Sequence, residues 1–225
     1  MKENFELHSL ISKLDGLRTL FVYDSVYAIR TLLFNHIIPH FSSKNVYIAV
    51  YTETMYRRLE RAYKSFIKIS PEVKEVFRDV KIIKIGLRER TAFGELYEFL
   101  SETTWYKRFL EIIREFGKRD VLILHGFSIL PVIYGDKGLT DIIRLLDSAN
   151  EDLTIIGKYA DKLYSERVEA LLERFYDVVI RIRRFEGNYL DISYSIDIDQ
   201  SILADLIPGT FGRFKIKDGE FVRVC

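Results

Sequence analysis

Short runs rich in β-branched and aromatic residues alternate along this chain with segments in which apolar residues recur at helical spacing. Strands that are separated by helices in this order form a mainly parallel sheet with helices on both faces. The sequence therefore predicts a three-layer α/β/α architecture. Five strands are predicted, each followed by helical sequence. Strand 19–23 precedes a helix over 26–41, strand 45–51 a helix over 55–66, and strand 80–85 two helical stretches across 92–116. Strand 121–125 precedes a helix within 139–148, and strand 153–158 a helix near 165–175.

The pattern changes after residue 176, where apolar and polar residues alternate. Residues 177–183 and 189–196 predict one antiparallel hairpin. Residues 211–225 predict a second hairpin, because Asp218-Gly219 supplies a positive-φ turn between two alternating strands. We expect a single domain over 1–225, with an N-terminal helix in 1–15, a parallel core in 16–176 and antiparallel hairpins in 177–225.

The composition indicates in which environment the protein works, but it does not indicate an activity. Thirty-four Lys and Arg against thirty-three Asp and Glu give a net charge of +1, which argues against a whole-surface field that recruits nucleic acid or membrane. The single cysteine, Cys225, permits no internal disulfide, and no apolar run is long enough to span a membrane. We expect a cytoplasmic protein. The 30 % of charged residues and the single glutamine resemble hyperthermophile composition.

The segment from Asp24 to Thr31 lies where many α/β proteins bind phosphate. A Walker A loop, G-x-x-x-x-G-K-[ST], wraps backbone amides around phosphate, and its lysine reaches the outer phosphates. Over that frame Asp24 and Ile29 replace the two glycines, Arg30 replaces the lysine, and only Thr31 remains. Asp24 adds negative charge and Ile29 adds bulk where backbone must approach the ligand. Asp24 or Ser25 is expected to cap the following helix.

The order of elements, with the C-terminal hairpins, resembles the RecA-like, KaiC-type branch of the P-loop ATPases, and in particular archaeal KaiC-like proteins of unknown function. In that family the fourth core strand ends in a magnesium-binding Asp, and His125 stands at the matching place. A catalytic glutamate follows strand two in that family, and Glu53 in 51-YTET-54 corresponds to it. Because both nucleotide motifs depart from the family pattern, we expect no ATPase activity and no bound ATP or magnesium.

The resemblance leaves a short set of candidate site residues. Glu53 and His125 are candidates for acid–base chemistry together with Asp24, since all three lie at the carboxyl ends of predicted strands. Asp24, Ser25, Arg30 and Thr31 are the candidates for binding a nucleotide or another anion. His36 and His40 have the spacing of two metal ligands on a helix, but two imidazoles fall short of a site, and no metal is expected.

Two basic clusters are candidates for an anionic partner. The predicted helix at 55–66 and the first hairpin carry them, as Arg57, Arg58, Arg61 and Lys64, and as Arg181, Arg183 and Arg184. Glu60 and the low net charge favour an ordinary solvated helix face instead, so nucleic acid is not the expected partner.

The leading hypothesis is a RecA-like domain without catalysis that serves as a protein-interaction or regulatory module. Self-association is implied by the resemblance, and a protein or peptide partner is expected. The alternative is a nucleotide-binding protein or slow ATPase that uses Arg30, Thr31 and Glu53 in a modified site. Nucleic-acid binding is a third and weaker hypothesis.

Overall fold

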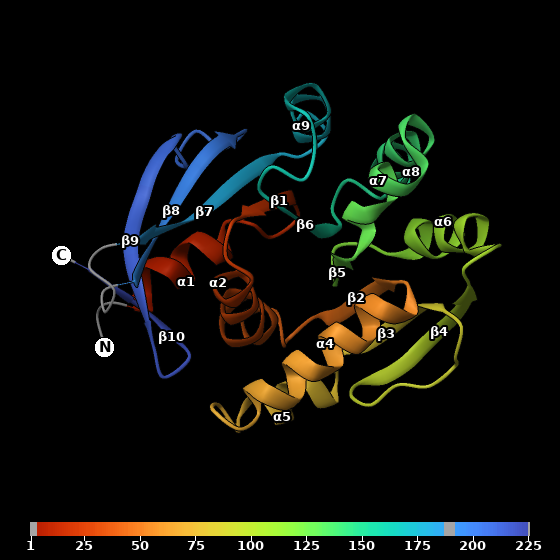
Figure 1. The fold of residues 1–225 in the computed structure, drawn as a ribbon, viewed down its shortest axis with the longest axis horizontal. Coiled ribbons are helices and arrows are strands. Elements are labelled where there is room, and N and C mark those ends of the chain that lie inside the picture. Colours follow the sequence, from red (N-terminus) through yellow and green to blue (C-terminus); the bar gives the residue numbers. More distant parts are fainter. Residues whose placement is uncertain (1–3, 187–191, 225) are drawn as a thin grey trace.

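The computed structural model describes residues 4–186 and 192–224 of the chain. Within them ten strands form one sheet (Figure 1). The strands are β1 (Arg18–Tyr23), β2 (Asn45–Tyr51), β3 (Lys81–Gly86), β4 (Glu95–Ser101), β5 (Asp120–His125), β6 (Thr154–Ala160), β7 (Val178–Glu186), β8 (Ile192–Ser201), β9 (Gly209–Lys217) and β10 (Glu220–Arg223). The helices are α1 (Asn4–Ser12), α2 (Val26–Thr31), α3 (Ile38–His40), α4 (Glu53–Phe66), α5 (Val73–Arg78), α6 (Trp105–Glu115), α7 (Leu130–Tyr134), α8 (Asp136–Ser148) and α9 (Glu166–Glu173), with a π-helical turn η1 (Leu32–Ile37) and a 3-10 turn η2 (Phe127–Ile129).

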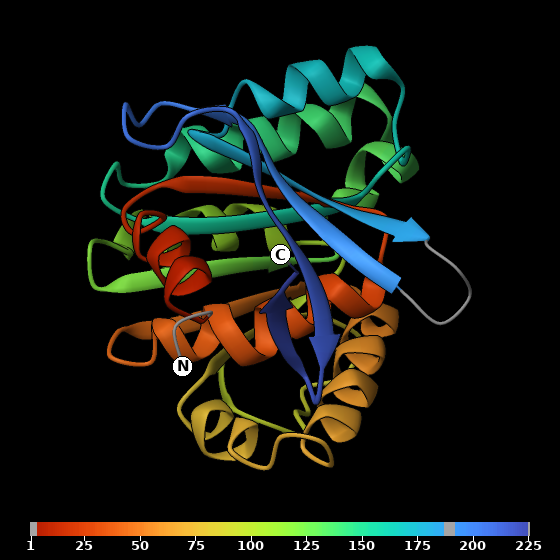
Figure 2. The same cartoon turned by 90° about the vertical axis from the view of Figure 1, so that its left-hand side faces the viewer.

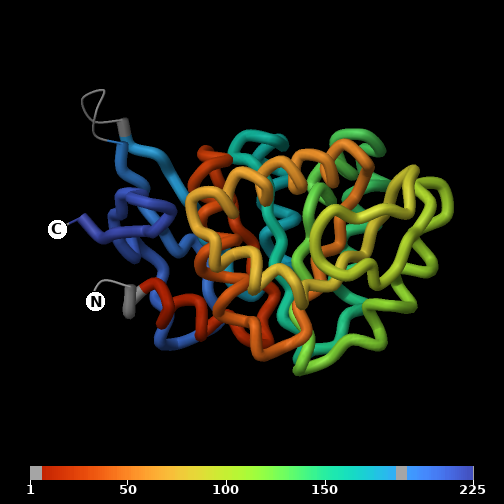
Figure 3. The backbone as a smooth tube through the Cα atoms, turned by 90° about the horizontal axis from the view of Figure 1, so that it is seen from below, coloured from red at the N-terminus to blue at the C-terminus, as the bar shows by residue number. Residues whose placement is uncertain are grey.

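The strands lie in the order β10-β9-β8-β7-β1-β6-β5-β2-β3-β4. Neighbours from β7 to β4 are parallel, whereas β7, β8, β9 and β10 pair antiparallel. The predicted mainly parallel sheet with antiparallel C-terminal hairpins is confirmed. Because β7 pairs with β1 on one side and β8 on the other, the sheet continues without a break into the C-terminal segment. Figure 3 shows the two ends of this sheet, with β9 and β10 at one and β4 at the other.

Helices cover both faces of the parallel strands. The helices from α1 to α5 pack on one face and those from α6 to α9 on the other (Figure 1). Strand β1 shows why both faces are apolar: Phe21 joins the first core, and Leu20 and Val22 join the second. Successive side chains of a strand alternate between faces, so a strand covered on both sides is a continuous apolar run. Burial of this kind fixes β1 in the middle of the molecule.

The predicted helix over 26–41 is divided by the π-turn η1. Asn35 lies in that turn, and its Nδ2 donates a hydrogen bond to the carbonyl oxygen of Gly219 at 2.6 Å. Gly219 belongs to the turn of the last hairpin, and Phe221 of β10 packs edge-on against His36 at 5.7 Å. Figure 2 shows β9 and β10 passing in front of this helical segment. The π-turn therefore presents a polar side chain that fastens the C-terminal hairpin to the core.

The antiparallel strand pairs of both predicted hairpins are present within the described residues. The turn between β9 and β10 has positive φ at Asp218 (51°) and Gly219 (81°), which is the backbone that a tight hairpin of this twist requires. The first hairpin is formed by β7 and β8. Part of its predicted second strand, at residues 189–191, lies outside the described residues.

The prediction of two helical stretches across 92–116 is wrong in its first half. Glu95–Ser101 is strand β4, and only α6 is helical there. Leu96, Phe99 and Leu100 have helical spacing, which produced the error. β4 is an edge strand that pairs only with β3, so most of its side chains are left partly exposed and its alternation is weak. The short helices α5 and α7 were not predicted at all.

No helix in the described part of the chain is long and apolar enough to cross a membrane.

The contact between α7 and α8 gives a test of the fold. A Cβ on Gly138 would lie 2.1 Å from the carbonyl oxygen of Leu130, a distance that only a backbone shift relieves. We expect Gly138→Ala to lower the free energy of unfolding by about 3 kcal/mol in denaturant titrations. Gly117→Ala is the matched control, since no atom lies within 4 Å of its added Cβ. Equal stability of the two variants would contradict this packing.

Candidate functional site: a basic pocket at the carboxyl edge of the sheet

A pocket of about 130 Å³ opens where the carboxyl ends of β1 and β5 meet helices α2 and α4. Binding sites of open α/β sheets lie at this edge, outside the carboxyl ends of the parallel strands. No carboxylate is present among the described residues that line the pocket. Those residues are Tyr23, Val26, Ile29, Arg30, Met55, Arg58, His125, Gly126, Ser128 and Lys158.

The connection from β1 to α2 consists only of Asp24 and Ser25. Both carboxylate oxygens of Asp24 accept the backbone N–H of Arg184, at 2.9 and 2.8 Å, which ties the connection to β7. Ser25 Oγ caps α2 by accepting the N–H of Ala28 at 3.3 Å. The residues that would wrap a phosphate in a Walker A loop are already helical here. Any anion at this place must therefore be held by side chains rather than by a curled run of amides.

Arg30 and Thr31 follow one turn inside α2, and they face in different directions. Arg30 lines the pocket. Thr31 is fully buried in the core, and its Oγ1 has no hydrogen-bond partner among the described residues. Of the four residues that the sequence suggested for binding an anion, only Arg30 thus faces the pocket.

Three cations surround the pocket without a counter-charge. Within the described part of the chain, no carboxylate forms an ion pair with Arg30, Arg58 or Lys158. Burial lowers the pKa of Arg30, and the neighbouring charge of Arg58 lowers it further. Burial likewise lowers the pKa of Lys158 to about 8, and Arg30 adds to that effect. Like charges held together away from water raise the free energy of the fold, and an anion between them would lower it.

His125 completes the wall of the pocket at the end of β5. Burial holds its pKa well below the ordinary value, and the charges of Lys158 and Arg30 act in the same direction. The imidazole is therefore neutral at pH 7. Its Nδ1 is buried and has no hydrogen-bond partner within the described residues. A neutral imidazole in the wall of the pocket adds a polar group without adding charge.

Glu53, in contrast, lies in a different groove, beside the loop between β3 and β4. Its Oε2 forms an ion pair at 3.1 Å with Nζ of Lys84, whose side chain is 1 % exposed. The same amine lies 4.1 Å from the centre of the Tyr56 ring and donates to the carbonyl oxygen of Arg90 at 2.9 Å. Glu53 is thus engaged in holding the loop after β3. The structure does not bring Glu53, His125 and Asp24 together in one pocket.

Thr52, which directly precedes α4, has an unusual backbone conformation. Its φ is 76°, in the region that favours glycine, and its Oγ1 accepts the N–H of Met55 at 3.3 Å as the cap of α4. A β-branched residue in this region costs about 1–3 kcal/mol. The strained turn directs Glu53 towards β3, while Met55 reaches the basic pocket.

The two basic clusters of the sequence are mostly neutralised by nearby carboxylates. On α4, Arg57 pairs with Glu53 at 3.8 Å and Lys64 pairs with Glu60 at 2.5 Å, whereas Arg61 is exposed. On the hairpin, Arg181 and Arg183 have acidic contacts. Arg181 contacts Asp161, Glu173 and Asp199 at 2.8, 3.2 and 2.6 Å, and Arg183 contacts Asp197 at 2.9 Å. Arg58 is the member of these clusters that turns to the basic pocket.

His36 and His40 lie away from the pocket, near α1 and the last hairpin. Burial lowers the pKa of His36 to about 4, so its ring is neutral at pH 7 although it lies 3.5 Å from Glu220. His40 Nδ1 lies 3.3 Å from His8 Nδ1. Within the described residues, no three His, Cys, Asp or Glu side chains gather in a way that could hold a metal ion.

Sequence reasoning missed Lys158, although one signal was available. Lys158 is the charged residue of the predicted strand 153–158, and it lies inside a strand rather than after one. Parallel pairing of β1 with β6 places it opposite Phe21, two residues before the end of β1. A lone lysine inside a buried strand requires a local reason, and here it lines the basic pocket.

No protein-family model matches this sequence, and no curated protein is similar to it in sequence. Solved structures, however, share its fold. The protein PH0250 of Pyrococcus horikoshii OT3 has 15 % identity and a TM-score of 0.65, with 90 % of this chain and 96 % of that chain covered. The KaiC-like protein PH0186 of the same archaeon has 13 % identity and a TM-score of 0.59, with 94 % and 90 % covered. The flagellar accessory protein FlaH of Methanocaldococcus jannaschii has 14 % identity and a TM-score of 0.57, with 96 % of both chains covered.

The unpaired charge of Lys158 gives a prediction for stability. Its folded pKa of about 8 lies below the unfolded value of 10.5, so between these values the unfolded chain binds more protons. The free energy of unfolding therefore rises with pH in that window, and the penalty is complete below about pH 8. In phosphate-free buffer at pH 7, we expect Lys158→Met to stabilise the fold by about 1–2 kcal/mol.

The stabilisation by Lys158→Met should shrink as the pH approaches 10. Lys158→Arg keeps the charge and should not be stabilised. Denaturant titrations of the wild type and the two variants across this pH range measure the free energies of unfolding. A Met variant that is less stable than the wild type at every pH would mean that the amine has a partner.

The likeness to these structures, all below 25 % identity, shows the fold and confirms the prediction from the sequence: the chain has the RecA-like fold of the KaiC-like protein PH0186 and of FlaH.

Proposed function

We propose that this chain is a RecA-like domain that binds a phosphate-bearing anion in the basic pocket and uses that binding for regulation rather than for hydrolysis. The observation that carries the proposal is the convergence of Arg30, Arg58 and Lys158 on a pocket without a carboxylate. Guanidinium groups and ammonium groups are the side chains that recognise phosphate. A pocket of about 130 Å³ has room for a phosphate group.

Magnesium does not fit the residues of this pocket. Mg²⁺ takes oxygen ligands, usually one or two carboxylates in addition to the phosphates of the nucleotide. Here His125 ends β5, Thr31 is buried within the helical core, and Glu53 is paired with Lys84. Hydrolysis of ATP depends on positioning of the metal and the phosphates. The residues present therefore support binding of the anion by cations alone.

Thermal unfolding with inorganic phosphate, pyrophosphate and ATP in EDTA tests the proposal. A ligand at 100 times its dissociation constant stabilises the fold by about 2.7 kcal/mol. We expect stabilisation that Arg30→Ala removes and that Arg61→Ala, an exposed arginine of the neighbouring α4, leaves unchanged. Chloride at matched ionic strength separates binding from screening.

Excess Mg²⁺ should weaken the effect of ATP, because the ion shields the phosphates and the pocket has no ligand to hold it. Stabilisation that requires Mg²⁺, or that persists in Arg30→Ala, would contradict the proposal.

Self-association is a second candidate, and helix α7 favours it. Val132, Ile133 and Tyr134 are consecutive and are 56, 53 and 49 % exposed. Three exposed apolar residues in a row are unusual in a monomer without a contact at that place. We expect light scattering to show an increase of mass with concentration that Ile133→Lys abolishes. Leu171→Lys, at a separate exposed site on α9, should leave it unchanged, and a concentration-independent monomer would exclude this candidate.

A further inference from the structure

Two lysines of the parallel sheet are held in opposite electrostatic environments. Lys84 of β3 is 1 % exposed and forms an ion pair with Glu53 at 3.1 Å. Lys158 of β6 has no carboxylate partner within the described residues and lies close to Arg30. A neighbouring cation and removal from water both favour the neutral form of the Lys158 amine. Only Lys158 has the setting of a nucleophile.

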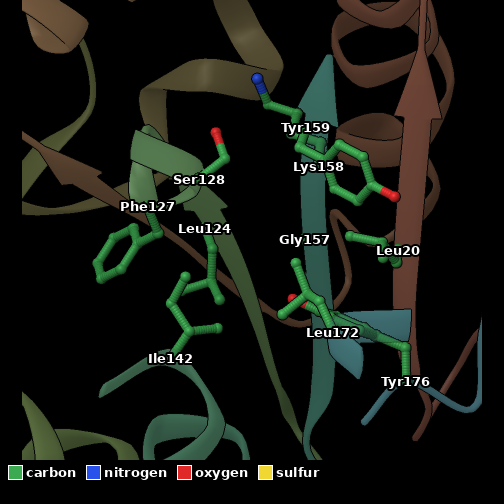
Figure 4. A pocket seen from close by; sticks show the side chains of 10 residues that line it. All are labelled: Leu20, Leu124, Phe127, Ser128, Ile142, Gly157, Lys158, Tyr159, Leu172 and Tyr176. Carbon is green, nitrogen blue, oxygen red and sulfur yellow. The ribbon is translucent and has the colours of Figure 1, made fainter. Parts of the chain in front are cut away.

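The side chain of Lys158 is directed away from the second hydrophobic core. Its neighbour Tyr159 is buried there, with its hydroxyl donating to Glu173 at 2.9 Å. Figure 4 shows the Lys158 side chain running away from the Tyr159 ring. Lys158 and Ser128 line both the basic pocket and a neighbouring cavity of about 20 Å³ (Figure 4). The amine also lies 5.9 Å from the centre of the Tyr23 ring. Its surroundings are therefore aromatic, hydroxylic and cationic.

We infer that Lys158 forms a Schiff base with an aldehyde that carries a phosphate group, with the phosphate held by Arg30 and Arg58. This inference rests on the proposed function, since the same two guanidinium groups bind the anion, and it names the class of ligand. The pocket combines the three parts that such a ligand needs: an amine, two guanidinium groups and the neutral imidazole of His125.

The reaction requires no oxidant or reductant. The free amine of Lys158 attacks the carbonyl carbon, a C–N bond forms, and the π electrons of the carbonyl move to oxygen, which takes a proton. The carbinolamine then loses its hydroxyl as water, with the second amine proton leaving, and the C=N bond replaces the C–O bond. Amine and aldehyde thus give imine and water. His125 lines the same pocket, and we assign to it the relay of these protons.

The state of the amine supports this chemistry. Burial, together with Arg30, lowers the pKa of Lys158 to about 8, so more of this amine is unprotonated near that pH than of an ordinary lysine. Lysines that form Schiff bases are activated by removal from water or by a neighbouring cation, and both conditions hold here. A bound phosphate dianion would raise the pKa again, but a protonated imine beside it would be stabilised by the same attraction.

Pyridoxal 5′-phosphate is the probe for the test, and pyridoxal is its counterpart without the phosphate. Each is mixed with the full chain at pH 8, the imine is followed by its visible absorbance, and borohydride reduction fixes it for peptide mass analysis. We expect the mass increase at Lys158, at least tenfold faster with pyridoxal phosphate than with pyridoxal. Lys84 serves as the internal control and should remain unmodified.

Two variants separate this inference from the proposed function. Lys158→Arg keeps the charge and should still be stabilised by inorganic phosphate, but it should form no imine. Arg30→Ala should lose the preference for pyridoxal phosphate over pyridoxal. Stabilisation by phosphate without modification of Lys158, or modification spread over surface lysines and unchanged in Lys158→Arg, would overturn the inference alone. Equal labelling of Lys158 by both aldehydes, without stabilisation by phosphate, would overturn the anion site and the inference with it.

Discussion

Uncompensated positive charge at the carboxyl edge of the sheet is the constraint on which this account depends. Arg30, Arg58 and Lys158 come from three different elements and meet around one pocket without a carboxylate. Elsewhere in the described structure, buried cations have partners: Lys84 has Glu53, and Arg181 contacts three carboxylates. A cluster of like charges lowers the stability of the fold, and a bound ligand that supplies the missing negative charge offsets that loss.

At the start of α2, a Walker A loop would bind phosphate through backbone amides, whereas here side chains form the proposed anion site. Because α2 begins at Val26, directly after Ser25, no long loop remains to wrap a phosphate. Asp24 is turned towards the amide of Arg184, and Ser25 caps the helix, so the polar groups of the connection serve the fold. The burial of β1 on both faces and its pairing with β6 and β7 then hold the start of α2 rigidly against the pocket.

The sequence predicted the layers well because they depend on local patterns. Alternating apolar runs and helical segments predicted the parallel sheet, and Asp218-Gly219 predicted the last turn. β4 was mistaken for a helix because an edge strand buries little and Leu96, Phe99 and Leu100 happen to have helical spacing. The π-turn was also invisible, since its cause is tertiary: Asn35 reaches a carbonyl 184 residues away in the chain.

The site was less predictable, because strand pairing, and not spacing along the sequence, brings its residues together. Motif comparison found Arg30 and His125, both of which line the pocket. It also grouped Glu53 and Asp24 with His125, since all three lie at strand ends, and only the structure shows that Lys84 holds the Glu53 carboxylate elsewhere. Lys158 belongs to no motif, and its place depends on the register between β1 and β6.

The most direct test of the account is the proton balance of phosphate binding, measured by titration calorimetry at pH 8 in two buffers with different enthalpies of ionisation. An anion between the cations should raise the pKa of Lys158 from about 8, so binding should take up protons from the buffer. The uptake should disappear in Lys158→Met. Phosphate binding without proton uptake in the wild-type protein, or no binding of phosphate at all, would contradict the claim that these unpaired cations form an anion site.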